Sequence, residues 1–123
     1  MKILGLRTTI YKVSDMEKAK KWYVDFLDFD PYFDEPFYVG FNVAGYELGL
    51  QPEEGLQSSE KADSVITYWG VENVSESFQT LISLGAKPHE EPTEVGGGII
   101  VASLKDPWEN IIGLIFNPHF SLS

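Results

Sequence analysis

The chain has 123 residues, 43% of them hydrophobic, which is enough for one domain with an ordinary packed core. Nineteen Asp and Glu against nine Lys and Arg give a formal net charge of -10, which makes nucleic acids and anionic membrane surfaces poor partners. The absence of cysteine excludes disulfides and thiolate chemistry. No stretch approaches the roughly 20 apolar residues of a membrane span, and the first residues lack a signal-type apolar run, so we expect a cytoplasmic protein.

The first half of the chain predicts a strand, a helix and a group of short strands. Residues 6–13 alternate with the period of a strand, and residues 14–27 switch to the spacing of a helix. Ser14 and Glu17 have the spacing of a capping box that would start this helix. Aromatic and β-branched runs punctuated by proline and glycine then predict about three strands within residues 29–50.

The second half repeats this order after a polar linker at residues 52–63. Residues 64–71 have the composition of a strand, and residues 72–88 show apolar side chains at helical spacing. Asn73 and Glu76 repeat the capping-box spacing at the start of the predicted helix. The linker therefore separates two segments with the same predicted order of elements.

Two apolar strands end the second half. A turn that contains Asp, Pro and Asn separates residues 96–104 from residues 111–116. The whole chain is then two βαβββ modules, at about residues 5–51 and 64–117, within a single domain of residues 1–123. We expect an α+β fold in which the two modules form a curved mixed sheet, with the helices outside and a concave face for a ligand.

Three segments in this order resemble one family. They are TTIYKVSDMEKAKKWYVDFLDF, YELGL and DPWENIIGLI, and with them the chain resembles the vicinal oxygen chelate superfamily of glyoxalases, bleomycin-resistance proteins and extradiol dioxygenases. The resemblance extends over residues 6–117. The family's closing motif is Asp-Pro-x-Gly-Asn, and this chain has Glu109 in place of the glycine.

The resemblance also implies where a metal would bind. Metalloenzymes of the family hold a divalent ion with His and Glu side chains from the first and last strand of each module, and these positions correspond here to Thr8, Glu47, Ile66 and Gly113. Only Glu47 can be a ligand of that type, because the others offer a neutral hydroxyl or no donor atom. The two histidines, His89 and His119, are expected in a turn and in the C-terminal tail. We therefore expect no metal and no other cofactor.

Glu47 is the strongest single candidate for a functional residue. A carboxylate on an otherwise apolar strand can bind a ligand cation, accept a hydrogen bond or act as a general base. The alternative is an ion pair with Lys12, which has the same strand parity as Thr8 and Ile10. The sequence leaves both open.

Aromatic residues form the second candidate group. Six of them lie between the first predicted helix and YELGL, where they either pack in the core or line a binding site. In the second module, Tyr68 shares the inward parity of Ile66, whereas Trp69 points the other way. The candidate ligand-binding residues are Thr8, Ile10, Lys12, Tyr38, Glu47, Ile66, Tyr68, Trp108 and Gly113.

The function implied by the resemblance is the binding of a small organic molecule in a metal-free cup, of the sequestration or resistance type, by a homodimer. The net charge favours a cationic or neutral ligand over an anionic one. The alternative is a lyase, isomerase or dioxygenase of the glyoxalase type, in which Glu47 acts with a divalent metal or as a catalytic general base. A third hypothesis is a non-binding domain whose cup is filled by Ile10, Ile66 and Ile115.

Overall fold

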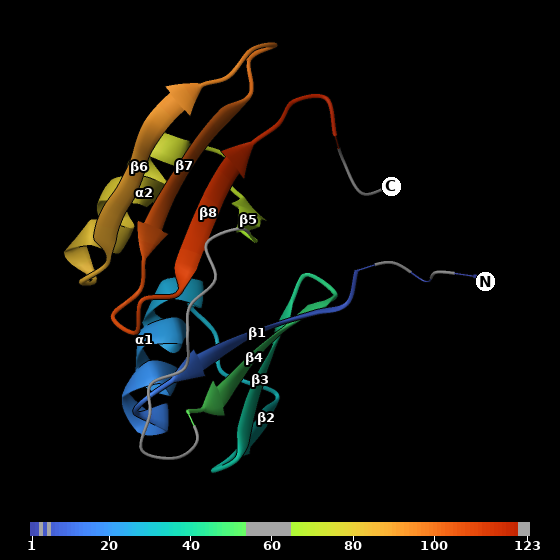
Figure 1. The fold of residues 1–123 in the computed structure, drawn as a ribbon, viewed down its shortest axis with the longest axis vertical. Helices are drawn as coiled ribbons and strands as arrows, with labels where there is room; N and C mark the ends of the chain where they lie inside the picture. Colours follow the sequence, from blue (N-terminus) through green and yellow to red (C-terminus); the bar gives the residue numbers. More distant parts are fainter. Residues whose placement is uncertain (3, 5, 54–64, 121–123) are drawn as a thin grey trace. The chain divides into compact units, whose positions relative to one another are not determined.

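The computed structural model describes residues 1–2, 4, 6–53 and 65–120. The chain forms two compact units, residues 1–60 and 61–123, and each contains a four-stranded sheet with a helix on one face (Figure 1). The elements follow the predicted βαβββ order twice, so the fold is α+β. The predicted linker comprises residues 52–63, and its residues 54–63 lie outside the described part of the chain.

The first unit consists of β1 (Thr8–Val13), α1 (Met16–Leu27), β2 (Phe33–Glu35), β3 (Tyr38–Val43) and β4 (Tyr46–Pro52). Its strand order is β1-β4-β3-β2, with β1 and β4 parallel and the other pairs antiparallel. The alternation of side chains along each strand sends one set of apolar residues toward α1, where they are buried. This set comprises Tyr11, Val13, Val39, Phe41, Leu48 and Leu50. The opposite face of the sheet bears the remaining alternate residues and is called the open face below.

Helix α1 begins one residue later than the capping box predicts. Asp15 is the N-cap, and its side chain accepts a hydrogen bond from the Lys18 N–H at 3.1 Å. The prediction of Ser14 as the cap was therefore wrong, because an aspartate at the next position offers a stronger acceptor to the same turn. The helix buries Ala19 and Tyr23 against the sheet.

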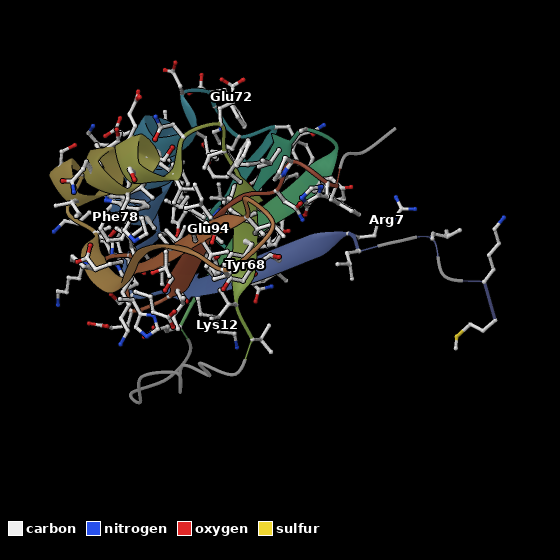
Figure 2. The ribbon with its side chains drawn as sticks, turned by 90° about the horizontal axis from the view of Figure 1, so that it is seen from above. Arg7, Lys12, Tyr68, Glu72, Phe78 and Glu94 are labelled. Atoms are coloured by element: carbon white, nitrogen blue, oxygen red, sulfur yellow. The ribbon has the colours of Figure 1, made fainter. Side chains whose placement is uncertain are left out.

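The second unit consists of β5 (Thr67–Gly70), α2 (Val74–Ser83), β6 (Lys87–Glu94), β7 (Ile100–Lys105) and β8 (Ile111–Phe116), in the strand order β5-β8-β7-β6. Asn73 caps α2 as predicted, because its side chain accepts from the Glu76 N–H at 3.0 Å. The helix ends in a turn that requires Gly85, whose φ is 105°. Figure 2 labels Phe78, which α2 buries.

Strand β6 is the element that the sequence did not predict. Residues 87–94 carry Lys, His, Glu and two prolines, and most of them are exposed. Such a composition is typical of an edge strand, which is protected from further pairing by charge and proline and lacks an apolar alternation. The Gly96–Gly98 segment, whose glycine run indicates a hairpin or hinge, forms the turn between β6 and β7, and all three glycines have positive φ.

The closing motif forms the turn between β7 and β8 around a buried carboxylate. Asp106 is fully buried, and its Oδ1 accepts from the backbone N–H groups of Trp108 and Asn110 at 2.9 and 2.8 Å. Its Oδ2 accepts from the Asn110 side chain at 3.1 Å. Glu109, at the glycine position of the motif, has a φ of 68°, which is unfavourable for a residue with a Cβ.

Replacing this residue with glycine should stabilise the second unit. We expect Glu109→Gly to raise the free energy of unfolding by about 1 kcal/mol, because glycine adopts positive φ without a steric penalty. The ion pairs from Glu109 to Lys87 and Lys105, at 3.6 and 3.8 Å, are exposed and contribute little. Urea denaturation measures the change. Glu109→Ala removes the same ion pairs but keeps the strain, so a gain in both variants would contradict the explanation.

Candidate functional site

Glu47 lies on the open face of the first unit, near the start of β4. The strand register places it directly beside Thr8 of β1 and Asn42 of β3. Its backbone N–H donates to the Arg7 carbonyl at 2.9 Å. The side chain is half-buried. Glu47 is therefore held by strand pairing on both sides, with its carboxylate on the face of the sheet opposite α1.

Two tyrosine hydroxyls donate hydrogen bonds to this carboxylate. The Tyr32 hydroxyl donates to Oε1 and the Tyr38 hydroxyl donates to Oε2. Tyr38 comes from β3, and Tyr32 lies just before β2, where its backbone N–H donates to the Gly40 carbonyl at 2.9 Å. Because each oxygen has its own donor, both the position and the plane of the carboxylate are constrained.

Two glycines make room for the tyrosine rings. Gly40 and Gly49 are directly paired across β3 and β4, so the open face has no side chain at this point. A Cβ at Gly49 would lie 2.7 Å from carbon atoms of the Tyr38 ring, and a Cβ at Gly40 would lie 3.2 Å from carbons of both rings. The rings therefore lie directly on the backbone of the sheet, which brings their hydroxyls to Glu47.

The environment of the two phenols keeps them protonated. The hydrogen bond to Glu47 is the largest cause that raises the pKa of Tyr32, followed by partial desolvation. Burial is the largest cause that raises the pKa of Tyr38 far above its ordinary value, followed by the hydrogen bond to Glu47. Both tyrosines therefore stay neutral hydrogen-bond donors at physiological pH.

Further aromatic rings lie beside the tyrosines. Phe33 of β2 is paired with Gly40, and its ring centroid is 6.1 Å from that of Tyr38 and 6.1 Å from that of Phe37. The exposed fractions are 62% for Tyr32, 39% for Phe33 and 66% for Phe37. We call the residues Tyr32, Phe33, Phe37, Tyr38 and Glu47 the aromatic carboxylate site. The exposed Tyr32 ring, whose hydroxyl contacts the carboxylate, can contact the apolar part of a ligand while the carboxylate meets a polar or charged part.

The ion pair with Lys12 is not the arrangement that Glu47 adopts. Thr8 lies opposite Glu47, whereas Lys12 lies opposite Gln51, about 13 Å further along the strands. Figure 2 shows Lys12 and Arg7 at opposite ends of β1. The backbone of Glu47 is hydrogen-bonded to that of Arg7, at the end away from Lys12. Shared parity places Lys12 on the same face, but its position along the strand is too distant for an ion pair at 4 Å.

The donor set does not fit the family's metal site. In β8, Gly113 pairs with Tyr68 as Gly49 pairs with Ile10. The residue that corresponds to Glu47 by strand register is therefore Ile111, two positions before Gly113, the position that the family resemblance implies. Isoleucine has no donor atom, and both Glu47 oxygens already accept from neutral phenols. Among the described residues, no three His, Asp or Glu side chains are grouped as a metal would require.

In the second unit, two candidate residues lie over a third. The side chains of Tyr68 and Ile66 lie over Gly113, as their shared parity predicts, because a Cβ there would be 2.6 Å from Tyr68 and 2.9 Å from Ile66. Trp108 lies in the turn between β7 and β8, where the sequence predicts a turn. His89 lies in β6, not in a turn as expected, with its Nδ1 2.8 Å from the Ser103 hydroxyl. His119 contacts the Gly97 carbonyl through Nε2 at 2.6 Å.

Sequence reasoning selected Tyr38 and Glu47 as site residues and included Tyr32 only among the six aromatic residues before YELGL; it did not select Gly40 or Gly49. Two glycines inside predicted strands were a usable signal, because an interior glycine often marks the close approach of another group. Tyr32 had no comparable signal, since it precedes its strand and reaches Glu47 only through the fold of the hairpin.

Glu47→Gln should move part of the alkaline titration of tyrosine to lower pH. The effect should fall mainly on Tyr32, whose pKa is raised chiefly by the Glu47 hydrogen bond. Tyr38 should keep more of its shift, because burial is its main cause. Absorbance of the phenolate band measures the titration, and Tyr46→Phe removes an exposed tyrosine elsewhere on β4 as a control. An unchanged curve in Glu47→Gln, after correction for unfolding, would contradict the assigned hydrogen bonds.

Tyr32 and Tyr38 also predict how the free energy of unfolding depends on pH. Because both pKa values are raised on folding, their stabilising contribution is complete below about pH 10, the ordinary tyrosine pKa, and is lost as pH rises through the folded-state values. The free energy of unfolding should therefore fall more steeply above about pH 10 in the wild type than in Glu47→Gln. Urea unfolding at several alkaline pH values measures both slopes, and equal slopes would contradict this linkage.

Gly49→Ala should displace Tyr38 from the carboxylate. The new Cβ would overlap the ring, so we expect a loss of about 1–3 kcal/mol in the free energy of unfolding and a lower pKa for Tyr38. Gly70→Ala is the matched control, because a Cβ at that strand glycine meets nothing within 4 Å. Denaturation and alkaline titration of the two variants provide the test, and equal behaviour would show that the glycine does not position the ring.

Comparisons with known proteins agree on the fold. A family model described as Glyoxalase/Bleomycin resistance protein/Dioxygenase superfamily matches residues 5–114. A glyoxalase-related enzyme from Fulvimarina pelagi is 16% identical, with a TM-score of 0.82 over 98% of this chain and 94% of its own. A glyoxalase/bleomycin resistance protein from Albidiferax ferrireducens T118 is 19% identical, with a TM-score of 0.73 over 91% of this chain and 98% of its own. TioX from Micromonospora sp. ML1 is 14% identical, with a TM-score of 0.70 over 91% of this chain and 98% of its own.

No curated protein matches the sequence, and at these identities the solved structures support the fold alone. In the part of the chain that the structure describes, no helix is long and apolar enough to cross a membrane. The family match extends over most of the chain and includes both modules. The chain therefore belongs to the glyoxalase, bleomycin-resistance and dioxygenase superfamily.

Proposed function

We propose that this protein binds a small organic cation at the aromatic carboxylate site, without a metal. The observation that carries the proposal is the Glu47 carboxylate, held by two neutral phenol donors beside exposed aromatic rings. The two tyrosines donate hydrogen bonds to the Glu47 carboxylate but carry no positive charge. A net negative charge therefore remains at the site for a ligand to neutralise.

The surroundings support a cation over an anion. Glu35 and Lys12 both lie on the open face in the row of Tyr38 and Gln51, four strand positions from Glu47, so neither changes the charge directly beside Glu47. The formal net charge of -10 favours the approach of a cation over longer distances. Binding would consist of ring contacts with the organic part of the ligand and charge neutralisation by Glu47.

The catalytic alternatives receive less support from the geometry. A general base must accept a proton from its substrate, and each Glu47 oxygen already uses one of its two lone pairs for a tyrosine hydroxyl. The raised pKa values make Tyr32 and Tyr38 weaker acids than ordinary tyrosines, which disfavours them as proton donors at neutral pH. A metal-dependent reaction would need ligands beyond the one carboxylate that the family's positions supply in this chain. Stoichiometric binding is the simpler use of this arrangement.

The proposal predicts that charge discriminates between ligands of one shape. Isothermal titration calorimetry with benzylammonium and benzyl alcohol compares a cation with a neutral molecule of similar size. We expect the cation to bind roughly tenfold more tightly, and Glu47→Gln to remove this preference. Tyr46→Phe serves as the control, because Tyr46 has the opposite strand parity to Glu47 and should not affect binding. Equal affinities in the wild type would contradict the proposal.

A further inference from the structure

We infer that the aromatic carboxylate site selects N-methylated ammonium groups over primary ammonium groups. The inference rests on the proposed function and specifies its ligand class. It follows from how the hydrogen-bond acceptors at the site are already used. Charge alone would attract both kinds of cation equally, so the selection must come from the atoms around the charge.

Two of the roughly four acceptor positions of the Glu47 carboxylate are occupied. Each carboxylate oxygen accepts from one tyrosine hydroxyl. Asn42, the cross-strand neighbour of Glu47, uses its side-chain oxygen to accept from the Gly45 N–H at 2.9 Å. A primary ammonium has three N–H donors and is strongly hydrated, so it needs several free acceptors to replace its water. This site can replace that water only in part.

A methylated ammonium needs fewer hydrogen-bond acceptors than a primary ammonium. A quaternary ammonium has no N–H donor and interacts favourably with aromatic faces and with a nearby negative charge. The site offers the exposed ring of Tyr32, whose hydroxyl contacts the carboxylate, and the ring of Phe33, whose centroid lies 6.1 Å from that of Tyr38. Methyl groups can pack against these rings while the positive charge stays close to Glu47.

The two tyrosines act through their hydroxyls as well as their rings. By occupying the carboxylate oxygens, they keep the charge of Glu47 but reduce its capacity to accept from a ligand. Tyr32→Phe keeps the ring and frees one oxygen, so it should favour the primary ammonium. This response separates selection by occupied acceptors from a simple preference for larger or more apolar ligands.

The experiment compares benzyltrimethylammonium with benzylammonium by calorimetric titration, with benzyl alcohol as the neutral reference. In the wild type we expect the trimethylated cation to bind roughly tenfold more tightly than the primary amine. In Tyr32→Phe this ratio should fall several-fold, and in Tyr46→Phe it should stay unchanged. Urea denaturation of each variant confirms that it is folded. Upfield shifts of the N-methyl proton signals on binding would place the methyl groups against aromatic rings.

Two results would overturn the inference in different ways. Equal or tighter binding of the primary amine, with both cations still preferred over the alcohol, would refute the selectivity and leave the proposed function intact. Failure of both cations to bind better than benzyl alcohol would refute the proposed function and the inference together. A trimethylated preference that is the same in Tyr32→Phe would refute the role of the occupied oxygens.

Discussion

The interaction on which the site depends is the pair of hydrogen bonds from Tyr32 and Tyr38 to the Glu47 carboxylate. A half-buried carboxylate on a sheet requires partners, because desolvation of an unpaired charge is costly. A lysine or arginine would satisfy it by neutralising its charge. Two phenols satisfy it and leave the charge in place. The difference determines what the site can do, since a neutralised carboxylate would have little attraction for a cation.

The fold supplies the conditions for these two hydrogen bonds. Strand pairing on both sides places Glu47 opposite Thr8 and Asn42, and the apolar alternate residues attach the sheet to α1. The directly paired glycines of β3 and β4 leave a gap that the tyrosine rings fill. A larger residue at either position would push the rings away from the backbone. The core packing and the site therefore use opposite faces of the same strands, which lets the site vary without disturbing the core.

Much of this architecture could be predicted from the sequence. The two switches from strand to helical periodicity predicted the repeated βαβββ order, and a carboxylate among Tyr46, Leu48 and Leu50 singled out Glu47. Parity correctly placed Tyr68 and Ile66 on one face. Parity alone, however, gives the face of a residue and not its position along the strand. For this reason Lys12 was considered a partner of Glu47, although the register separates them.

The remaining differences have similar physical causes. Strand β6 lacks an apolar alternation because it is an exposed edge, so its sequence resembles a loop. The expected correspondence between Glu47 and Gly113 was wrong by two residues. The strand register aligns Gly113 with Gly49, so the counterpart of Glu47 is Ile111. Tyr32 precedes its strand, and its contact with Glu47 depends on how the hairpin closes. Local sequence patterns contain little information about such contacts between distant segments.

The central claim is that the charged carboxylate of Glu47 receives an organic cation against the aromatic rings of the first unit. A crystal structure of the protein with benzyltrimethylammonium bound tests it most directly. The account predicts the trimethylammonium group within contact distance of the Glu47 carboxylate, with its methyl groups against Tyr32, Phe33 or Phe37, and both tyrosine hydroxyls still donating to Glu47. A divalent metal coordinated by Glu47, or a ligand bound away from this carboxylate, would contradict it.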